Sequence, residues 1–240
     1  TVVVSHQSEL KLAIFDLDGV VTDTAELHYE AWKALAESLD IPFDREFNEK
    51  LKGVSRIDSL NLILSKGDIK LSEAEKQQLA SKKNEHYKQL LNNLSPSDIL
   101  PGAVELLSAL KKEGIKIALA SASQNAPMIL SQLQIQGFFD LIVDPTKLGA
   151  GKPDPEIFMT AAEYFNVDYC DCLGIEDADA GVEAIVSSGM IALRVGSQNN
   201  ASKAHLSVKG LDLVNLAQLK SLFSTGSNKV VYDDRNSTGV

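Results

Sequence analysis

Short apolar runs alternate with amphipathic segments through most of this chain. Residues 12–15 form an apolar run of the kind that a parallel strand buried on both faces shows. Further apolar runs predict strands at 115–120, 141–143, 172–175, 191–195 and 211–214. Amphipathic segments predict helices at 103–112, 127–133, 154–165, 180–188 and 216–223. Strands that alternate with helices indicate a parallel sheet with right-handed crossovers.

The segment from residue 25 to residue 94 departs from this alternation. Leu27, Trp32, Leu35 and Leu39 recur at helical spacing, and Ile41-Pro42 predicts the end of that helix. Further helices are predicted at 45–51, 55–64 and 72–91, the last with a capping box of Ser72 and Glu75. No strand is predicted there, so this segment is interpreted as a helical insertion.

The predicted fold is therefore α/β: a Rossmann-like doubly wound parallel sheet core with an inserted α-helical cap domain. The core is expected to comprise residues 1–24 and 95–224, and the cap residues 25–94. Residues 225–240 show no periodicity and are expected to be disordered or foreign to the natural chain.

Composition narrows the function classes. A net charge of −10 over 240 residues argues against non-specific binding to nucleic acid or to an anionic membrane. No apolar run approaches the length of a membrane-spanning helix, and the N-terminus lacks a signal-peptide pattern, so a cytoplasmic protein is expected. Cys172 opens an apolar run and is expected to be buried, while Cys170 and Cys172 alone are a weak metal signal.

Two carboxylates follow the first predicted strand directly. Asp16 and Asp18 are separated by one residue, and Gly19 suits a tight turn after them. Because ligands bind at the carboxyl ends of strands in open α/β sheets, both side chains are expected to face a binding crevice. The alternative is a solvated strand-to-loop turn.

Polar residues follow three other predicted strands. They are Ser121 with Ser123 and Asn125, then Lys152, then Glu176 with Asp177. Asp16, the backbone carbonyl of Asp18, Glu176 and Asp177 offer the oxygen ligands that Mg²⁺ prefers, and Ser121 and Lys152 suit phosphate oxygens. Taken singly, each has a structural alternative: a helix-capping serine, a solvated loop lysine, or acids that favour the next helix N-terminus.

Residues 16–24, Asp-Leu-Asp-Gly-Val-Val-Thr-Asp-Thr, resemble the first motif of the haloacid dehalogenase superfamily, DxDGxxxDT. The four polar sets also follow the order of the four motifs of that superfamily. The resemblance implies that Asp16 is a nucleophile that carries a phosphoryl group and that Asp18 is a general acid and base. It also implies catalytic roles for Ser121 and Lys152.

Residues 51–60 of the insertion are similar to the cap motif KGxSRxxSL of the β-phosphoglucomutase family. The resemblance extends over about residues 11–195 and implies that Thr24 and His28 couple cap closure to catalysis. The substrate-binding residues that it implies are Trp32, Lys52, Gly53, Val54, Ser55, Arg56, Lys83, Ser123, Gln124 and Asn125.

The family resemblance implies a Mg²⁺-dependent phosphomutase that interconverts β-glucose 1-phosphate and glucose 6-phosphate through a 1,6-bisphosphate. The alternatives are a phosphatase of small sugar phosphates and a non-catalytic phosphosugar-binding protein. Gln124 and Ala178 depart from the family pattern, which often has Lys and Ser at these positions. The expected protein is a monomer that acts on a phosphorylated sugar and its bisphosphate, without a nucleic-acid or membrane partner.

Overall fold

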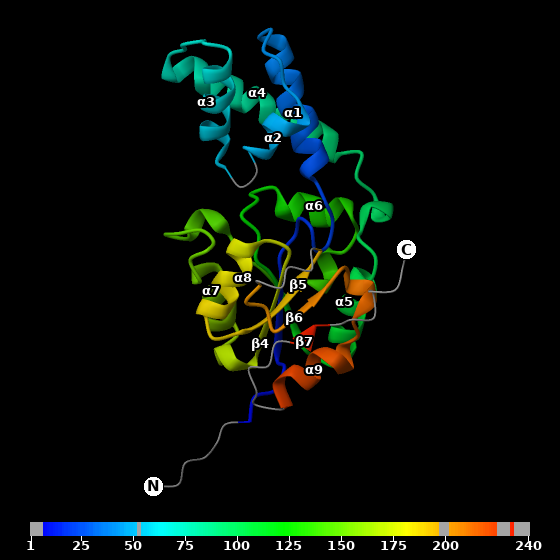
Figure 1. The fold of residues 1–240 in the computed structure, drawn as a ribbon. Coiled ribbons are helices and arrows are strands. Elements are labelled where there is room, and N and C mark those ends of the chain that lie inside the picture. Colours follow the sequence, from blue (N-terminus) through cyan, green and yellow to red (C-terminus); the bar gives the residue numbers. More distant parts are fainter. Residues whose placement is uncertain (1–6, 52–53, 197–201, 225–230, 233–240) are drawn as a thin grey trace. The chain divides into compact units, whose positions relative to one another are not determined.

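The computed structural model describes residues 7–51, 54–196, 202–224 and 231–232. The chain divides into two compact units (Figure 1). The core unit comprises Thr1–Asp23 and Ser95–Val240, and the helical unit comprises Thr24–Leu94. Each unit is built around its own set of buried apolar side chains.

The core unit contains one parallel sheet with the strand order β3-β2-β1-β4-β5-β6-β7. The strands are β1 (Leu12–Phe15), β2 (Lys116–Leu119), β3 (Leu141–Ile142), β4 (Cys172–Glu176), β5 (Ile191–Val195), β6 (Leu206–Val208) and β7 (Val231–Tyr232). All residues of β1 and β4 are buried, which explains their continuous apolar runs. The predicted Rossmann-like parallel sheet is thereby confirmed.

The chain changes direction across the sheet between β1 and β4. From the central β1 it proceeds outward to β2 and β3, then returns to add β4 on the other side of β1. In a doubly wound sheet, the crevice at such a switch point is where ligands bind. Asp16 directly follows β1 and Glu176 ends β4, so both lie at this point.

Helices cover both faces of the sheet (Figure 1). They are α5 (Ala103–Lys112), α6 (Ala126–Gln132), α7 (Glu156–Tyr164), α8 (Asp179–Ser187) and α9 (Leu216–Ser224). Ile157 and Phe158 of α7 and Ile185 of α8 pack with Leu12 and Ile14 of β1 in one buried cluster. Single-turn 3₁₀ helices occur at Pro96–Asp98, Gln136–Phe138, Pro145–Lys147, Tyr169–Asp171 and Leu211–Leu213.

The prediction of a strand at 211–214 is wrong. Leu211–Leu213 form a 3₁₀ helix instead, and strand β6 lies just before it. A Cβ atom at Gly102 would lie 2.1 Å from the backbone nitrogen of Asp212, so this segment packs against the loop before α5. The three residues of β6 were missed because so short a run carries no periodicity.

The tail prediction also needs a correction. Val231–Tyr232 form the edge strand β7 beside β6, although no regular structure was expected after residue 224. Valine and tyrosine are residue types that strands favour, but two residues are too few for a pattern. Residues 225–230 and 233–240 lie outside the described residues.

The helical unit consists of α1 (Ala25–Ser38), α2 (Arg45–Glu49), α3 (Arg56–Lys66) and α4 (Glu73–Leu91). Trp32 and Leu35 of α1 pack with Leu60 and Ile63 of α3 in its buried cluster. The predicted capping box is confirmed, because the Ser72 hydroxyl accepts from the Glu75 amide while the Glu75 carboxylate accepts from the Ser72 amide.

Cys172 is buried, as predicted, and Cys170 is exposed. Within the part of the chain that the structure describes, no helix combines the length and the apolar character needed to cross a membrane.

The substitution Leu60→Ala is expected to lower the free energy of unfolding of the helical unit by about 2–5 kcal/mol, because Leu60 is fully buried and a cavity would remain. Chemical denaturation followed by the fluorescence of Trp32, the one tryptophan of the chain, measures this loss. Leu62→Ala on the same helix is the matched control: Leu62 is 40% exposed, so a change within about 0.5 kcal/mol is expected. Equal losses in the two variants would contradict the packing described for α3.

Candidate active site

Lys152 joins three segments at the carboxyl edge of the sheet. Its Nζ lies 3.2 Å from Oδ1 of Asp16 and 2.8 Å from the carbonyl oxygen of Ala120, and it also donates to Oε1 of Glu176. The side chains of Lys152 and Asp16 are 16% and 14% exposed. The structure thus brings together the predicted residues at the ends of β1 and β4 with the predicted loop lysine.

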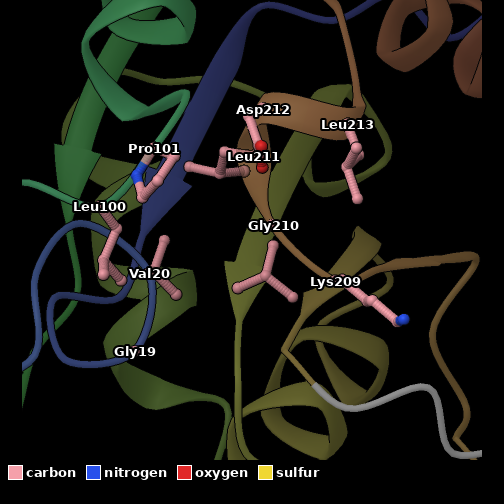
Figure 2. A pocket seen from close by; sticks show the side chains of 10 residues that line it. Gly19, Val20, Leu100, Pro101, Lys209, Gly210, Leu211, Asp212 and Leu213 are labelled. Carbon is pink, nitrogen blue, oxygen red and sulfur yellow. The ribbon is translucent and has the colours of Figure 1, made fainter. Parts of the chain in front are cut away.

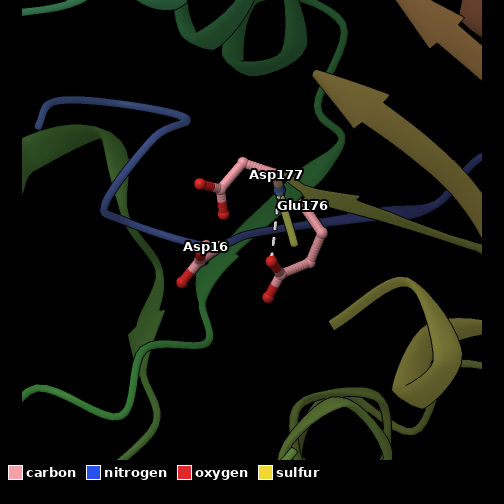
Figure 3. A group of neighbouring side chains, drawn as sticks. All are labelled: Asp16, Glu176 and Asp177. Atoms are coloured by element: carbon pink, nitrogen blue, oxygen red, sulfur yellow. Dashed lines mark hydrogen bonds between the residues drawn. The ribbon is translucent and has the colours of Figure 1, made fainter. Parts of the chain in front are cut away.

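Three carboxylates gather at the same place (Figure 3). Each of Asp16, Glu176 and Asp177 offers an oxygen, and these oxygens lie within 4.8 Å of one another. The Asp177 amide donates to Oε2 of Glu176 at 3.2 Å, which orients the Glu176 side chain. This is the only such group of three potential metal ligands among the residues that the structure describes.

The electrostatics of this cluster favour a bound cation. Burial and the Asp16 charge raise the pKa of Glu176, and the same two causes raise the pKa of Asp177 to about 6. Burial lowers the pKa of Lys152, but Asp16 and Glu176 outweigh it and the net pKa is raised. The Lys152 ammonium contacts two of the three carboxylates, and an all-oxygen donor set suits a hard divalent cation.

Glycine permits the close approach of the carboxylates to the backbone. A Cβ at Gly19, whose φ is +80°, would lie 2.0 Å from Oδ2 of Asp177. A Cβ at Gly181 in α8 would lie 2.0 Å from Cδ of Glu176. The sequence pointed to Gly19 as a turn residue, whereas Gly181 was missed. A glycine in the first turn of the helix after Glu176 was the available signal.

Asp18 is half-buried, and its charge contributes to the raised pKa of Asp177, so its side chain lies near the cluster. It is not part of the group of three ligands, and the predicted use of its backbone carbonyl stays a prediction.

The serines after β2 form local turns. The Ser121 hydroxyl accepts from the Ser123 amide at 3.1 Å, and the Ser123 hydroxyl accepts from the Asn125 amide at 3.2 Å. Ser121 is buried, Ser123 and Asn125 are half-buried, and Gln124 is exposed. Such turn bonds fix the loop and leave the hydroxyl hydrogens available to a ligand.

Glu156 was not predicted as a site residue, yet it holds the loop that carries Lys152. Its carboxylate accepts from the Gly149 amide at 3.0 Å and from the Ala150 amide at 2.9 Å. The loop before Lys152 is thus tied to the first residue of α7. Beside this loop is a cavity of about 270 Å³ whose lining includes Lys152 and Gln124.

A second cavity of about 270 Å³ is lined by residues of the core unit alone (Figure 2). Val20, Leu100, Pro101 and Leu211 supply most of its apolar lining, and Gly19 borders it. Its lining contains none of the three clustered carboxylates, so the cavity is not assigned to the chemistry.

In the helical unit, four of the predicted residues lie together. Nζ of Lys83 is 2.9 Å from Nδ1 of His28 and 4.5 Å from the centre of the Trp32 ring. Tyr87, which the sequence analysis missed, stacks on His28 with ring centres 3.9 Å apart and donates to the Thr24 hydroxyl at 3.2 Å. Its position one turn after Lys83 was the only sequence signal.

This cluster is electrostatically unlike the carboxylate site. Burial and the positive charge of Arg56 together lower the pKa of Lys83 to about 7. Burial and the charges of Lys83 and Arg56 lower the pKa of His28 to about 3, so His28 is neutral at pH 7.

The remaining predicted residues are at the start of α3. The Ser55 hydroxyl caps the helix by accepting from the Asp58 amide at 3.2 Å, Arg56 is its first residue, and Val54 is exposed. Lys52 and Gly53 lie outside the described residues.

Comparison with known proteins identifies the family. The haloacid dehalogenase-like hydrolase profile matches residues 10–189. The β-phosphoglucomutase of Bacillus subtilis (strain 168) is 54% identical over 202 residues, which span 83% of this chain and 89% of the relative. A phosphorylated carbohydrates phosphatase of Thermotoga maritima is 32% identical over 75% of this chain and 82% of the relative.

A solved structure agrees with these relatives. The crystal structure of a β-phosphoglucomutase from Clostridium difficile superposes with a TM-score of 0.80 at 44% identity, covering 89% of this chain and 97% of that one. These similarities favour the phosphomutase interpretation over the phosphatase alternative. Phosphomutases of this family depend on a metal ion, and the three clustered carboxylates are suited to hold one. The chain belongs to the haloacid dehalogenase-like superfamily and, within it, to the β-phosphoglucomutase family.

Proposed function

We propose that this protein is a Mg²⁺-dependent enzyme that interconverts β-D-glucose 1-phosphate and glucose 6-phosphate through glucose 1,6-bisphosphate. The observation that carries the proposal is the arrangement at the switch point of the sheet, where Asp16 contacts Lys152 and shares a cluster with two further carboxylates. The identity to β-phosphoglucomutases supports the choice of reaction.

The core residues can divide the chemistry among them. A carboxylate oxygen of Asp16 attacks phosphorus, and the bond from phosphorus to the sugar oxygen breaks as the aspartyl phosphate forms. Asp18 supplies the proton to the departing sugar oxygen and takes one back when the other sugar hydroxyl attacks the aspartyl phosphate. Lys152 and Ser121 bind phosphate oxygens and offset their charge.

Asp16, Glu176 and Asp177, together with the backbone carbonyl of Asp18, are the proposed ligands of Mg²⁺. When bound, the ion neutralises negative charge on the transferring phosphoryl group. The geometry supports the fit, because three carboxylates with oxygens within 4.8 Å of one another form an all-oxygen donor set. Burial and the Asp16 charge raise the pKa values of Glu176 and Asp177, and a bound cation would favour their charged forms.

Residues of the helical unit are proposed to bind the sugar phosphate. A guanidinium suits a phosphate through two parallel hydrogen bonds, which makes Arg56 the proposed partner of the phosphate that is not being transferred. Trp32, Lys52, Gly53, Val54, Ser55 and Lys83 are the further proposed substrate contacts, with Ser123, Gln124 and Asn125 from the core unit. Thr24 and His28 are proposed to link movement of the helical unit to catalysis. A monomeric, cytoplasmic enzyme stays a prediction.

A coupled assay tests the reaction. The full chain is given β-glucose 1-phosphate, Mg²⁺ and a trace of the 1,6-bisphosphate, and glucose 6-phosphate and inorganic phosphate are followed together. Formation of glucose 6-phosphate with little inorganic phosphate is expected, and Asp16→Asn is expected to abolish it because an amide is a poor nucleophile. Inorganic phosphate as the main product would instead establish the phosphatase alternative.

Replacing Arg56 by alanine is expected to reduce kcat/KM of the mutase reaction by about 10- to 100-fold, since a hydrogen bond to a charged group contributes about 1.5–3 kcal/mol. Phosphorylation of Asp16 by a small phosphoryl donor, followed by intact mass, is expected to change little. Arg45→Ala, which removes an exposed arginine paired with Glu26 in the same unit, is the control and should retain both activities. An equal loss of phosphorylation and mutase turnover in Arg56→Ala would contradict the assigned role.

Lys83 predicts a specific pH dependence. Its pKa of about 7 means that the positive charge of Lys83 is lost as pH rises. Among the described residues, its surroundings include neutral His28, the Trp32 and Tyr87 rings and the cation Arg56. KM for β-glucose 1-phosphate is therefore expected to rise about tenfold or more between pH 7 and pH 9. In Lys83→Met the KM should be high throughout and lack this rise, whereas Lys82→Met, at an exposed neighbouring position, should behave as the wild type. A wild-type alkaline rise that persists in Lys83→Met would assign the titration to another group.

A further inference from the structure

An arginine on strand β5 is almost fully buried. The side chain of Arg194 is 7% exposed, whereas that of its partner Asp179, the first residue of α8, is 78% exposed. Nη1 of Arg194 donates to Oδ1 of Asp179. Burying a guanidinium costs free energy unless its charge is compensated. The partner of Arg194 is an exposed aspartate, so this pair compensates the buried charge only in part.

The register of the sheet places Arg194 beside the carboxylate cluster. Glu176 of β4 pairs with Arg194 of β5, which pairs with Ser207 of β6. Residues paired in this way project from the same face of a parallel sheet. Nε of Arg194 and the hydroxyl of Ser207 have no hydrogen-bond partner among the described residues, whereas Nη1 of Arg194 donates to Asp179.

Helix α8 packs on this face at unusually short range. A Cβ at Gly174 would lie 2.5 Å from Cγ1 of Ile185, and a Cβ at Gly181 would reach the Glu176 carboxylate. Only Asp177 and Ala178 connect the end of β4 to the start of α8. Two residues span about 7 Å at most, so the position of Asp179 limits the position of the Asp177 carboxylate.

The start of α8 lacks a side-chain hydrogen bond from its N-cap residue. Ala178 occupies the N-cap position and makes no side-chain hydrogen bond there. A serine or an aspartate in that position would accept from a backbone amide of the first turn and stabilise the helix start by about 1 kcal/mol. The pair of Arg194 and Asp179 joins this helix start to the adjacent strand instead.

We propose that Arg194 and Asp179 are positioning residues that hold the Asp177 turn in place and thereby set the affinity for the divalent cation. The inference rests on the proposed function, because it requires the metal site formed by Asp16, Glu176 and Asp177. In this proposal the positively charged Arg194 on β5 strengthens the binding of the divalent metal ion. Its direct electrostatic effect would be the opposite, because two positive charges repel each other.

The variant Arg194→Met separates the two effects. If Arg194 acted only through its charge, its removal would strengthen Mg²⁺ binding, because repulsion between two cations would be lost. If it acts by holding the turn, removal weakens binding by about tenfold, as is typical when a group that orients a metal ligand is lost. Methionine fills similar space without a charge, and Asp179 is exposed enough to be solvated alone, so the variant should fold.

The dissociation constant for Mg²⁺ is measured by calorimetry on the full chain without substrate, together with the unfolding temperature. Lys220→Met is the matched control, since it removes a lysine paired with Glu113 from an exposed site in the same unit. Asp179→Asn should weaken Mg²⁺ binding as Arg194→Met does, while Asp179→Glu should restore it. At saturating Mg²⁺, kcat of Arg194→Met should approach the wild-type value, since the loss is in metal affinity.

Unchanged or tighter Mg²⁺ binding in Arg194→Met overturns the inference while leaving the proposed function intact. If Arg194→Met does not fold, Arg194→Lys takes its place: it keeps the charge with a shorter, single-point donor, and wild-type affinity with this variant overturns the geometric role. A wild-type protein that binds no Mg²⁺ overturns the metal site of the proposed function together with this inference.

Discussion

The core unit depends on the burial of carboxylates around one lysine. Asp16 and Glu176 share the ammonium of Lys152, and Asp177 adds a third negative charge with no ammonium of its own in the cluster. Burying such a concentration of like charge opposes folding unless a counter-charge or a metal ion compensates it. Burial and the neighbouring Asp16 charge raise the pKa values of Glu176 and Asp177, and a divalent cation would offset the negative charge of the cluster.

Close packing keeps these charges in place. Gly19 and Gly181 leave room for Asp177 and Glu176, and Gly174 lets α8 approach β4. Hydrogen bonds then secure the loops that no strand or helix constrains, as Glu156 does for the loop before Lys152. The pair of Arg194 and Asp179 fits the same scheme, because it fixes the short turn that carries Asp177.

The buried lysine of the helical unit, Lys83, has a lowered pKa, whereas the pKa of Lys152 in the core unit is raised. Carboxylates raise the pKa of Lys152, whereas burial among aromatic rings and the charge of Arg56 lower the pKa of Lys83. A lysine without a buried carboxylate gains most from an anionic ligand, because the ligand supplies the missing counter-charge. The two lysines therefore suit different tasks: Lys152 stays charged beside Asp16, whereas Lys83 changes its charge near pH 7.

The sequence by itself determined the α/β alternation, the helical insertion and most helices to within a few residues, because periodicity and capping are local properties. It also determined that Asp16, Lys152, Glu176 and Asp177 follow strands or precede a helix, and parallel strands bring such positions to one edge. Only the tertiary structure decided the short strand β6, the stacking of Tyr87 on His28, the low pKa of Lys83 and the pairing of Arg194 with Asp179. These features depend on which surfaces meet across the fold, and a pattern read along one segment carries no information about the segment that packs against it.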